Sequence, residues 1–251
     1  MRLAAGAIAA GVGLIACDTI GSTNAEALAH GRAGERGPLW VTARAQTAGR
    51  GRRGRIWVSE PGNLFASLLL TDPAPPERAA QLSFVAALAT HDAITALAPA
   101  LAPRMAFKWP NDVLLDSQKL AGILIEAEGT PLIAAIGIGV NCRHHPDGTD
   151  YPATDLAGAV AAQALFEALT DAMVHRLREW QAGFASIRAA WLDRALGGEL
   201  RARLGSREIT GRFETLDDAG RLVLRLPDGG RETIAAGEVF PIAPPPSGVG
   251  R

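Results

Sequence analysis

The segment from Ala48 to Arg55 reads AGRGRRGR and contains four arginines and three glycines. Glycine lets the backbone approach a bound molecule closely, and guanidinium groups bind carboxylate and phosphate oxygens through charge-assisted hydrogen bonds. The arginines have no acidic neighbour in this segment, so we expect a loop that is mobile until an anion orders it, as in active-site lids. It is not a Walker A loop, which would read G-x-x-x-x-G-K-[ST]. The alternative is a solvated basic tract that binds nucleic acid without sequence preference.

A second candidate segment, FKWPNDVLL, runs from 107 to 115. Pro110 cannot donate a hydrogen bond within a sheet and favours an extended Trp109, which predicts that Asn111 and Asp112 lie at a strand boundary. An amide and a carboxylate at such a place could bind Mg²⁺ through their oxygens or orient a nucleotide. Taken alone, the pattern is explained more simply by an ordinary Pro-Asn-Asp turn.

Lysine is rare in this chain. Of the 25 basic residues, only Lys108 and Lys119 are lysines. In a chain biased toward arginine, a remaining lysine is a candidate for a position that needs a compact ammonium charge instead of a planar guanidinium. Lys119 opens the apolar run KLAGILIE, where the alternative is an edge residue whose charged end reaches water. Chance survival explains Lys108 better than it explains Lys119.

Two further patterns concern the backbone. In IGIGVN, from 136 to 141, glycines alternate with β-branched residues, which clears one face of a strand for a flat ligand or another backbone. In Ser22-Thr23-Asn24-Ala25-Glu26, Thr23 and Glu26 form a capping box, which predicts a turn from a strand into a helix.

These segments need a sheet to position them. The turn Asp116-Ser117-Gln118 should close a hairpin that places Lys119 at its mouth and Asp112 opposite Gly122. The order of the elements predicts an α+β fold, in which helices cover a mixed sheet. From apolar periodicity and turn signals we expect strands at 13–17, 39–43, 64–70, 106–109, 112–115, 120–126 and 132–140, and helices at 23–30, 77–97, 157–180 and 186–195.

A change of pattern at Leu196-Gly197-Gly198 marks a second domain. From 199 to 242, short runs of alternating apolar and polar residues are separated by turn signals about ten residues apart, which predicts a small all-β barrel. We therefore expect a domain at 1–196, a second one at 197–243, and a frayed tail at 244–251.

The composition limits the classes of function. The formal net charge is −1 and the pI is near 6.5, which argues against a dedicated nucleic-acid-binding protein. Cys17 and Cys142 are far apart and show neither disulfide-framework nor zinc-site spacing, which suits a reducing compartment. The apolar stretch before Cys17 could be read as a lipoprotein signal, but a buried first strand explains it equally well. No run is long and apolar enough for a membrane span.

Taken in order, the motifs closely resemble those of the bacterial biotin protein ligase family, the biotin--[acetyl-CoA-carboxylase] ligases. The resemblance extends from about Leu14 to Ile242. It implies an SH2-like mixed sheet flanked by helices, of the class II synthetase type, followed by a small SH3-like β-barrel. The matching motifs are Ser22-Thr23-Asn24, the segment 46–55, Lys108-Trp109-Pro110-Asn111-Asp112, Lys119-Leu120-Ala121-Gly122 and Gly137-Ile138-Gly139-Val140-Asn141.

The resemblance also implies roles for single residues. In catalysis it implies Lys119, Arg50 and Asp112. It implies Asn111 and Asp112 as ligands of a Mg²⁺ that arrives with the nucleotide. Of the four arginines in the loop, it implies that Arg53 points to solvent. The implied biotin-binding residues are Ser22, Thr23, Asn24, Gln46, Arg50, Gly51, Arg52, Lys119 and Gly122. The implied ATP-binding residues are Arg50, Arg52, Arg55, Trp57, Asn111, Lys119 and Asn141.

The implied activity has two steps. Biotin reacts with Mg·ATP to give biotinyl-5′-adenylate and pyrophosphate, and a lysine of a biotin carboxyl carrier protein or domain then accepts the biotin. The implied substrates are biotin and ATP with Mg²⁺, without a tightly bound cofactor, a nucleic-acid partner or a membrane. The expected compartment is the cytoplasm, and a homodimer is compatible with the resemblance. Only 21 residues precede Ser22, too few for the helix-turn-helix domain of the members that repress transcription.

Two other functions are weighed against this one. A lipoate–protein ligase shares the catalytic fold and the acyl-adenylate chemistry, but the paired GRGRRGR and KWPND motifs with the appended barrel favour biotin. An RNA-binding module would explain the basic loop and the barrel. The pI and the scarcity of aromatic residues in the barrel, where only Phe213 and Phe240 occur, argue against it.

Overall fold

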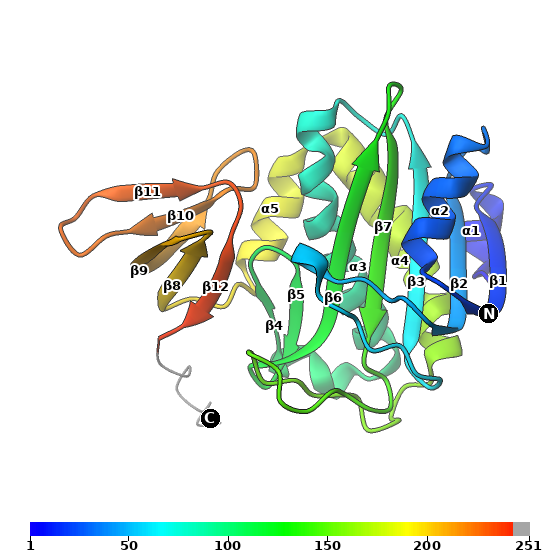
Figure 1. Cartoon of the computed structure of the whole chain (residues 1–251), viewed down its shortest axis with the longest axis horizontal. Helices are drawn as coiled ribbons and strands as arrows, with labels where there is room; N and C mark the ends of the chain where they lie inside the picture. The colour runs from blue at the N-terminus through cyan, green and yellow to red at the C-terminus, as the bar shows by residue number, and fades with distance from the viewer. Residues whose placement is uncertain (243–251) are drawn as a thin grey trace.

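The structure, a computed structural model, describes residues 1–242 and contains two β-sheets (Figure 1). The tail expected at 244–251 and the last residue of the expected second domain lie outside the described residues. The helices are α1 (Ala5–Ala9), α2 (Thr23–Arg32), α3 (Leu82–Leu97), α4 (Ala162–Ala182) and α5 (Phe184–Leu192), with short 3₁₀ turns at Arg52–Gly54, Pro76–Gln81 and Pro99–Arg104.

The larger sheet has seven strands in the order β1-β2-β3-β7-β6-β5-β4. The pair β1–β2 is parallel, and all other neighbours are antiparallel, so the sheet is mixed as expected. Its strands are β1 (Gly13–Ile20), β2 (Leu39–Gln46), β3 (Leu64–Thr71), β4 (Met105–Lys108), β5 (Asp112–Leu115), β6 (Gln118–Glu128) and β7 (Ile133–Val140).

Helices cover the two faces of this sheet unequally (Figure 1). On one face α3, α4 and α5 bury the main apolar core, in which Trp40 packs edge-on against Phe166. On the other face α2 packs against β2, β3 and β7, where Ala27 and Leu28 share an apolar cluster with Val41, Leu69 and Ala135. Beyond α2, the loop between β2 and β3 crosses this face, and its Trp57 lies against Gly122 of β6 and Gly139 of β7.

Three local details differ from the expectations. Helix α1 was not expected. The N-cap of α2 is Ser22, whose Oγ accepts a hydrogen bond from Ala25 N at 3.5 Å, and not Thr23, which is the first residue inside the helix. Helix α4 begins at Ala162 instead of 157, because Ala157 has a left-handed backbone (φ 49°) and the preceding Leu156 N–H is bound to the carbonyl of Asn141.

The smaller sheet is antiparallel, with five strands in the order β11-β10-β9-β8-β12. The turn between β9 and β10 contacts the larger sheet just after β4, where Trp109 Nε1 donates to the carbonyl of Gly220 at 3.1 Å. No helix among residues 1–242 is both long and apolar enough to cross a membrane. The strands are β8 (Glu199–Leu204), β9 (Arg207–Leu216), β10 (Leu222–Arg225), β11 (Arg231–Ile234) and β12 (Glu238–Pro241).

Candidate active site

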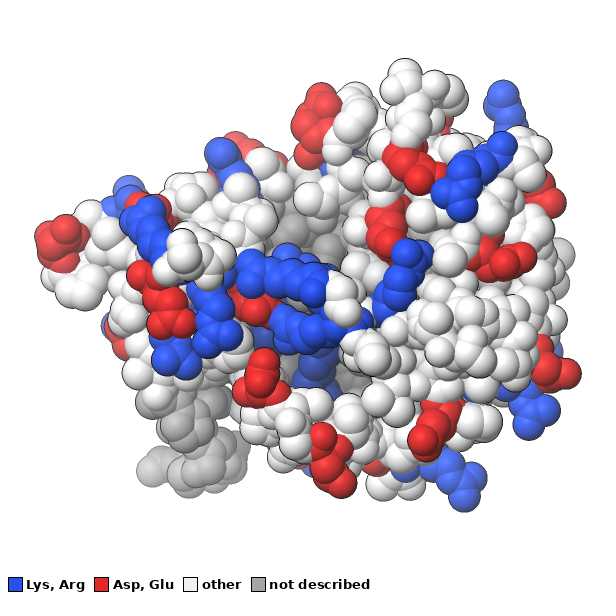
Figure 2. Space-filling model, in the orientation of Figure 1, with Lys and Arg blue, Asp and Glu red and all other residues white. Residues whose placement is uncertain are grey.

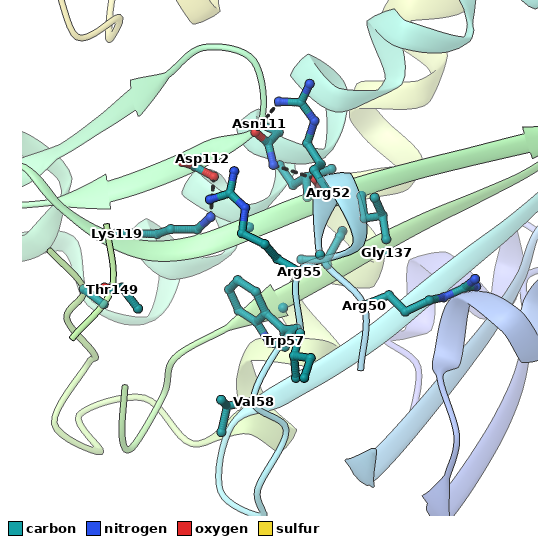
Figure 3. Close-up of a pocket in the computed structure, with 18 of the residues that line it drawn as sticks. Arg50, Arg52, Arg55, Trp57, Val58, Asn111, Asp112, Lys119, Gly137 and Thr149 are labelled. Atoms are coloured by element: carbon teal, nitrogen blue, oxygen red, sulfur yellow. Dashed lines mark hydrogen bonds and ion pairs between the residues drawn. The ribbon is translucent and has the colours of Figure 1, made fainter. Parts of the chain in front are cut away.

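One pocket, beside α2 on the face of β6 and β7, is lined by every residue for which the resemblance implies a catalytic, substrate-binding or metal-binding role, and Figure 3 shows part of this lining. Its walls come from the start of α2, the arginine-rich loop, the β4–β5–β6 region, the segment after β7, and β12. Basic side chains gather on the molecular surface around this hollow, beside the smaller sheet (Figure 2). The expected residues that line it are Ser22, Thr23, Asn24, Gln46, Arg50, Gly51, Arg52, Arg55, Trp57, Asn111, Asp112, Lys119, Gly122 and Asn141.

At one end of the pocket, the start of α2 forms a buried polar wall. Thr23 donates from its backbone N–H to Gln46 Oε1 at 2.7 Å, and its hydroxyl lies 3.1 Å from the same oxygen. Asn24 Nδ2 donates to a carboxylate oxygen of Glu126 at 2.8 Å. Thr23 and Asn24 are both buried. The network holds several side chains in fixed directions, as recognition of a small polar group requires.

At the other end, Asp112 lies between the two lysines of the chain. Its Oδ2 is 2.7 Å from Lys108 Nζ, and its Oδ1 is 2.7 Å from Lys119 Nζ. Burial of Asp112 would raise its pKa, but the two ammonium groups outweigh burial and hold the pKa well below the usual range. The expected hairpin is present, and Asp112 pairs with Gly122 as predicted. Asp112 is therefore a buried, ionised carboxylate that holds Lys119 at the pocket.

The oxygens of Asn111 and Asp112 that a cation would need are already in use. Asn111 Oδ1 accepts from Arg52 Nη1 at 3.2 Å, while its Nδ2 donates to the carbonyl of Ile123 at 2.9 Å. Both carboxylate oxygens of Asp112 contact ammonium groups. Within residues 1–242, no group of three or more His, Cys, Asp or Glu side chains is arranged to hold a metal ion. This arrangement favours charge balance at Asp112 over coordination of Mg²⁺.

The arginine-rich loop is held by acidic and carbonyl groups from distant parts of the chain. Arg50 Nη2 lies 3.1 Å from Glu126, so its guanidinium points away from Asp112 and Lys119 (Figure 3). Arg52 is the most enclosed of the four arginines and also donates to the carbonyl of Gly237 at 3.3 Å. Burial lowers the pKa of Arg52. The loop thus has acidic neighbours in space that the sequence around it does not contain.

Arg53 and Arg55 both bind Glu238 of β12. The Arg53 ion pair measures 3.2 Å, and Arg55 contacts the other carboxylate oxygen. Arg53 is exposed and does not line the pocket, in agreement with the expectation that it faces solvent, and its ion pair with Glu238 lies at the surface. Glu238 is only 17% exposed. The smaller sheet therefore anchors the loop that covers the pocket.

The glycines of β6 and β7 make room for flat groups. Gly122 and Gly139 are paired across the two strands, and the indole of Trp57 lies against both. A Cβ atom would lie 2.8 Å from the indole at Gly122 and 2.6 Å from it at Gly139, closer than van der Waals contact allows. At Gly137 the group in the cleared space is the Asn24 carboxamide. The cleared face is present as predicted, and side chains of this protein pack on it.

Sequence reasoning did not identify several residues of the site. Lys108 was explained as a chance survivor, yet it lies four residues before Asp112 across a tight turn and is almost fully buried. Tyr151, whose pKa is raised to about 12 by burial and by the nearby Asp112 charge, lines the pocket beside Lys108. Glu238 contacts Arg53, which lies 185 positions earlier in the chain, and no local sequence pattern predicts that contact. The rarity of lysine was the one sequence feature that could have identified Lys108, because only two lysines occur in the chain.

Comparison with known protein families gives two matches along the chain. Residues 18–142 match the biotin/lipoate A/B protein ligase family, and residues 195–240 match the biotin protein ligase C-terminal domain. The first match covers the start of α2, the arginine-rich loop and the β4–β7 region. The second covers the smaller sheet.

Individual relatives and a solved structure agree with these matches. The chain is 47% identical over 234 residues to the biotin--[acetyl-CoA-carboxylase] ligase of Paracoccus denitrificans, covering 87% of this chain and 96% of that one. It is 34% identical over 247 residues to the Mycobacterium tuberculosis protein of the same name, covering 92% and 91%. The Aquifex aeolicus biotin protein ligase in complex with biotin and ATP superposes with a TM-score of 0.75 at 27% identity, covering 91% of this chain and 97% of that one.

Proposed function

The chain belongs to the biotin protein ligase family, and we propose that it attaches biotin to a protein lysine in two steps that use ATP. In the first step, a carboxylate oxygen of biotin attacks the α-phosphorus of Mg·ATP, which forms biotinyl-5′-adenylate and releases pyrophosphate. In the second step, the uncharged amine of a carrier lysine attacks the acyl carbon, which forms an amide and releases AMP and a proton. The need for ATP suggests the cytoplasm as the compartment.

The observation that carries this proposal is the meeting of fixed cations with a buried polar wall in one pocket. The first step brings the carboxylate of one substrate onto the phosphate of the other, so its main needs are alignment and neutralisation of charge. Lys119 supplies a compact cation whose position is fixed by Asp112. No protein nucleophile is needed, because the biotin carboxylate is itself the nucleophile.

The two ends of the pocket then take different parts of the substrates. The wall at Thr23, Asn24 and Gln46 binds the ureido head of biotin, whose carboxylate reaches Lys119. Arg52 and Arg55, with Asn111, bind the phosphates, and Trp57 covers the adenine. Closure of the arginine-rich loop keeps water from the adenylate. Support for this division comes from the opposite chemical character of the two ends, one neutral and one cationic.

Asp112 acts as an orienting anion in this proposal. Its two oxygens bind Lys108 and Lys119, so the Mg²⁺ that accompanies ATP is held chiefly by the phosphate oxygens of the nucleotide. Because the pKa of Asp112 is held low, it is a weak base and does not take the proton of the incoming amine. Its role is instead to hold the ammonium group of Lys119 in place at the pocket.

Of the alternatives, lipoate is disfavoured by the names of the relatives, both of which are biotin ligases. The RNA-binding alternative is disfavoured because the loop arginines are directed to Glu126, Asn111 and Glu238.

The transfer step can be tested with an isolated biotin carboxyl carrier domain. Incubation with the purified protein, biotin and Mg·ATP should increase the mass of the carrier by one biotin group less one water, as measured by intact mass spectrometry. A carrier whose acceptor lysine is replaced by arginine is the matched control and should gain nothing. A carrier that stays unmodified while the protein consumes ATP and biotin would contradict the transfer step alone.

A further inference from the structure

Ser67 is a buried hydroxyl in a strand that is otherwise almost entirely apolar. It lies in the middle of β3, LFASLLLT, and none of its surface is exposed. Hydrogen bonds join its Oγ to Thr23 Oγ1 at 2.8 Å and to Asn24 Oδ1 at 2.6 Å. Ser67 does not line the pocket. It therefore contacts two residues of the pocket wall from behind and can act on a ligand only through them.

The neighbours of Asn24 fix the direction of its amide group. Its Nδ2 donates to the carbonyl of Leu124 at 3.2 Å and to the carboxylate of Glu126 at 2.8 Å, and both of these groups can only accept. The amide oxygen must then face Ser67. An amide oxygen also can only accept, and oxygens 2.6 Å apart need a proton between them. The single proton of Ser67 consequently lies on the bond to Asn24.

The position of that proton decides what Thr23 offers to the pocket. The two hydroxyl oxygens of Ser67 and Thr23 lie 2.8 Å apart, and since the one proton of Ser67 is used on Asn24, a hydrogen bond between them can only use the proton of Thr23. The only other partner of the Thr23 hydroxyl among residues 1–242 is Gln46 Oε1, 3.1 Å away, which is also an acceptor. In both cases Thr23 gives its proton to the protein. Its oxygen keeps lone pairs free for a donor from the ligand.

We propose that Ser67 is a positioning residue that fixes Thr23 as a hydrogen-bond acceptor and so selects a head group carrying an N–H donor. The inference rests on the proposed function, because the cyclic urea of biotin carries N–H groups, whereas the dithiolane of lipoate carries none. A site built to accept such a hydrogen bond rejects a ligand that leaves its buried acceptor unpaired. Without Ser67, the Thr23 hydroxyl keeps only the longer contact to Gln46 Oε1, at 3.1 Å, so its proton is held less strictly away from the pocket and competes with the ligand N–H.

The test measures binding by titration calorimetry for biotin and for its two cyclic carbamate isosteres, each with one ureido N–H replaced by oxygen. Ser67→Ala should weaken biotin binding about tenfold, the effect of one hydrogen bond, and should leave the isostere that lacks the relevant N–H within about twofold of the wild type. Ser67→Cys keeps a weak donor of similar size and should recover part of the loss. Thr90→Val is the control, since it removes a buried hydroxyl that bonds only to the Ala86 carbonyl within α3.

Each outcome separates the possibilities. A loss for biotin that is absent for one isostere and partly reversed in Ser67→Cys supports the inference. Equal losses for biotin and both isosteres would show that Ser67 only supports the fold locally, and an unchanged affinity for biotin in Ser67→Ala would also overturn the inference. A wild-type protein that does not bind biotin overturns the proposed function itself, which is a different failure.

Discussion

The centre of the site is a carboxylate shared by two ammonium groups. Asp112 is buried, and each of its oxygens lies 2.7 Å from a lysine nitrogen. A buried charge of this kind is stable only because it is paired. Removal of one partner leaves the charge unpaired and lowers the free energy of unfolding. The chain uses arginine at every other basic position, so the geometry at Asp112 explains why lysine remains at 108 and 119.

Replacement of Lys119 tests the need for a compact cation. Lys119→Arg keeps the charge, but a planar guanidinium cannot take the place of the ammonium between Asp112 and the pocket. We expect adenylate formation to slow about a hundredfold, the usual effect of losing one preorganised electrostatic group. Single-turnover measurement of biotin-dependent pyrophosphate release gives this rate directly. A rate near that of the wild type would contradict the claim that position 119 needs a compact ammonium group.

Replacement of Lys108 tests the charge balance at Asp112 through pH. The folded-state pKa of Asp112 is depressed, so its stabilisation is present above the ordinary value of 3.8 and is lost as the pH falls through the lower folded value. Lys108→Met leaves Lys119 as the only ammonium group that opposes the effect of burial, so the pKa of Asp112 rises and less stabilisation remains to be lost; the stability curves of the two proteins should converge as the pH falls below 3.8. We also expect the free energy of unfolding at pH 7 to fall by about 3 kcal/mol.

Urea unfolding of the wild type and Lys108→Met from pH 7 down to about pH 2 covers the window below 3.8 and measures both effects. Arg104→Met is the matched control, because it breaks a pair with Asp116 in which both side chains are about half exposed. Such exposed pairs contribute about 1 kcal/mol or less. Parallel stability curves for the wild type and Lys108→Met would contradict this account of Asp112.

At the scale of the elements, the arginine-rich loop depends on contacts from β12. Arg52 donates to Asn111 and to the carbonyl of Gly237. Arg52→Gly removes both contacts and adds backbone freedom, so we expect adenylate to escape and to modify bystander proteins. Biotin incorporated into added serum albumin, relative to the carrier domain, measures this loss of selectivity. The exposed Arg36→Gly is the control. An unchanged ratio in Arg52→Gly would contradict the role of the loop as a lid.

Glu238 gives a second test of the same element. Glu238→Gln weakens the ion pairs to Arg53 and Arg55, so the amides of residues 50–55 should exchange hydrogen several times faster. Hydrogen–deuterium exchange with mass spectrometry measures this directly. Glu214→Gln is a matched control, because Glu214 also pairs with two arginines, Arg225 and Arg231, within the smaller sheet. Equal exchange of the loop in both variants would argue against anchoring by β12.

The elements that the sequence predicted well are those specified by local signals. The strand at 112–115 and its hairpin follow from adjacent apolar residues and a turn, and both are present with the expected pairing. The start of α4 was placed five residues too early, because the backbone on either side of Ala157 is hydrogen-bonded to Asn141 and Cys142, just after β7, and no local pattern reveals these bonds. Short helix α1 lacks a capping side chain, which explains why no start signal for it was visible.

At the scale of the whole molecule, the pocket is built from both sheets. The start of α2 and the larger sheet supply the polar wall, Asp112 and Lys119, all of which lie in motifs that could be ordered along the sequence. The smaller sheet supplies Glu238 and Phe240 and accepts a hydrogen bond from Lys108 through the carbonyl of Val239 at 3.5 Å. These contributions depend on docking of two distant segments, so sequence patterns could predict the smaller sheet but not its part in the site.

The most direct test of the account is exchange of labelled pyrophosphate into ATP by the purified wild-type protein, measured with biotin, with lipoate and without an added acid. The pocket combines an acceptor wall for a urea head group with a cation at the reacting carboxylate, so we predict rapid exchange with biotin and none above background with lipoate. Exchange supported by lipoate and not by biotin would contradict the account.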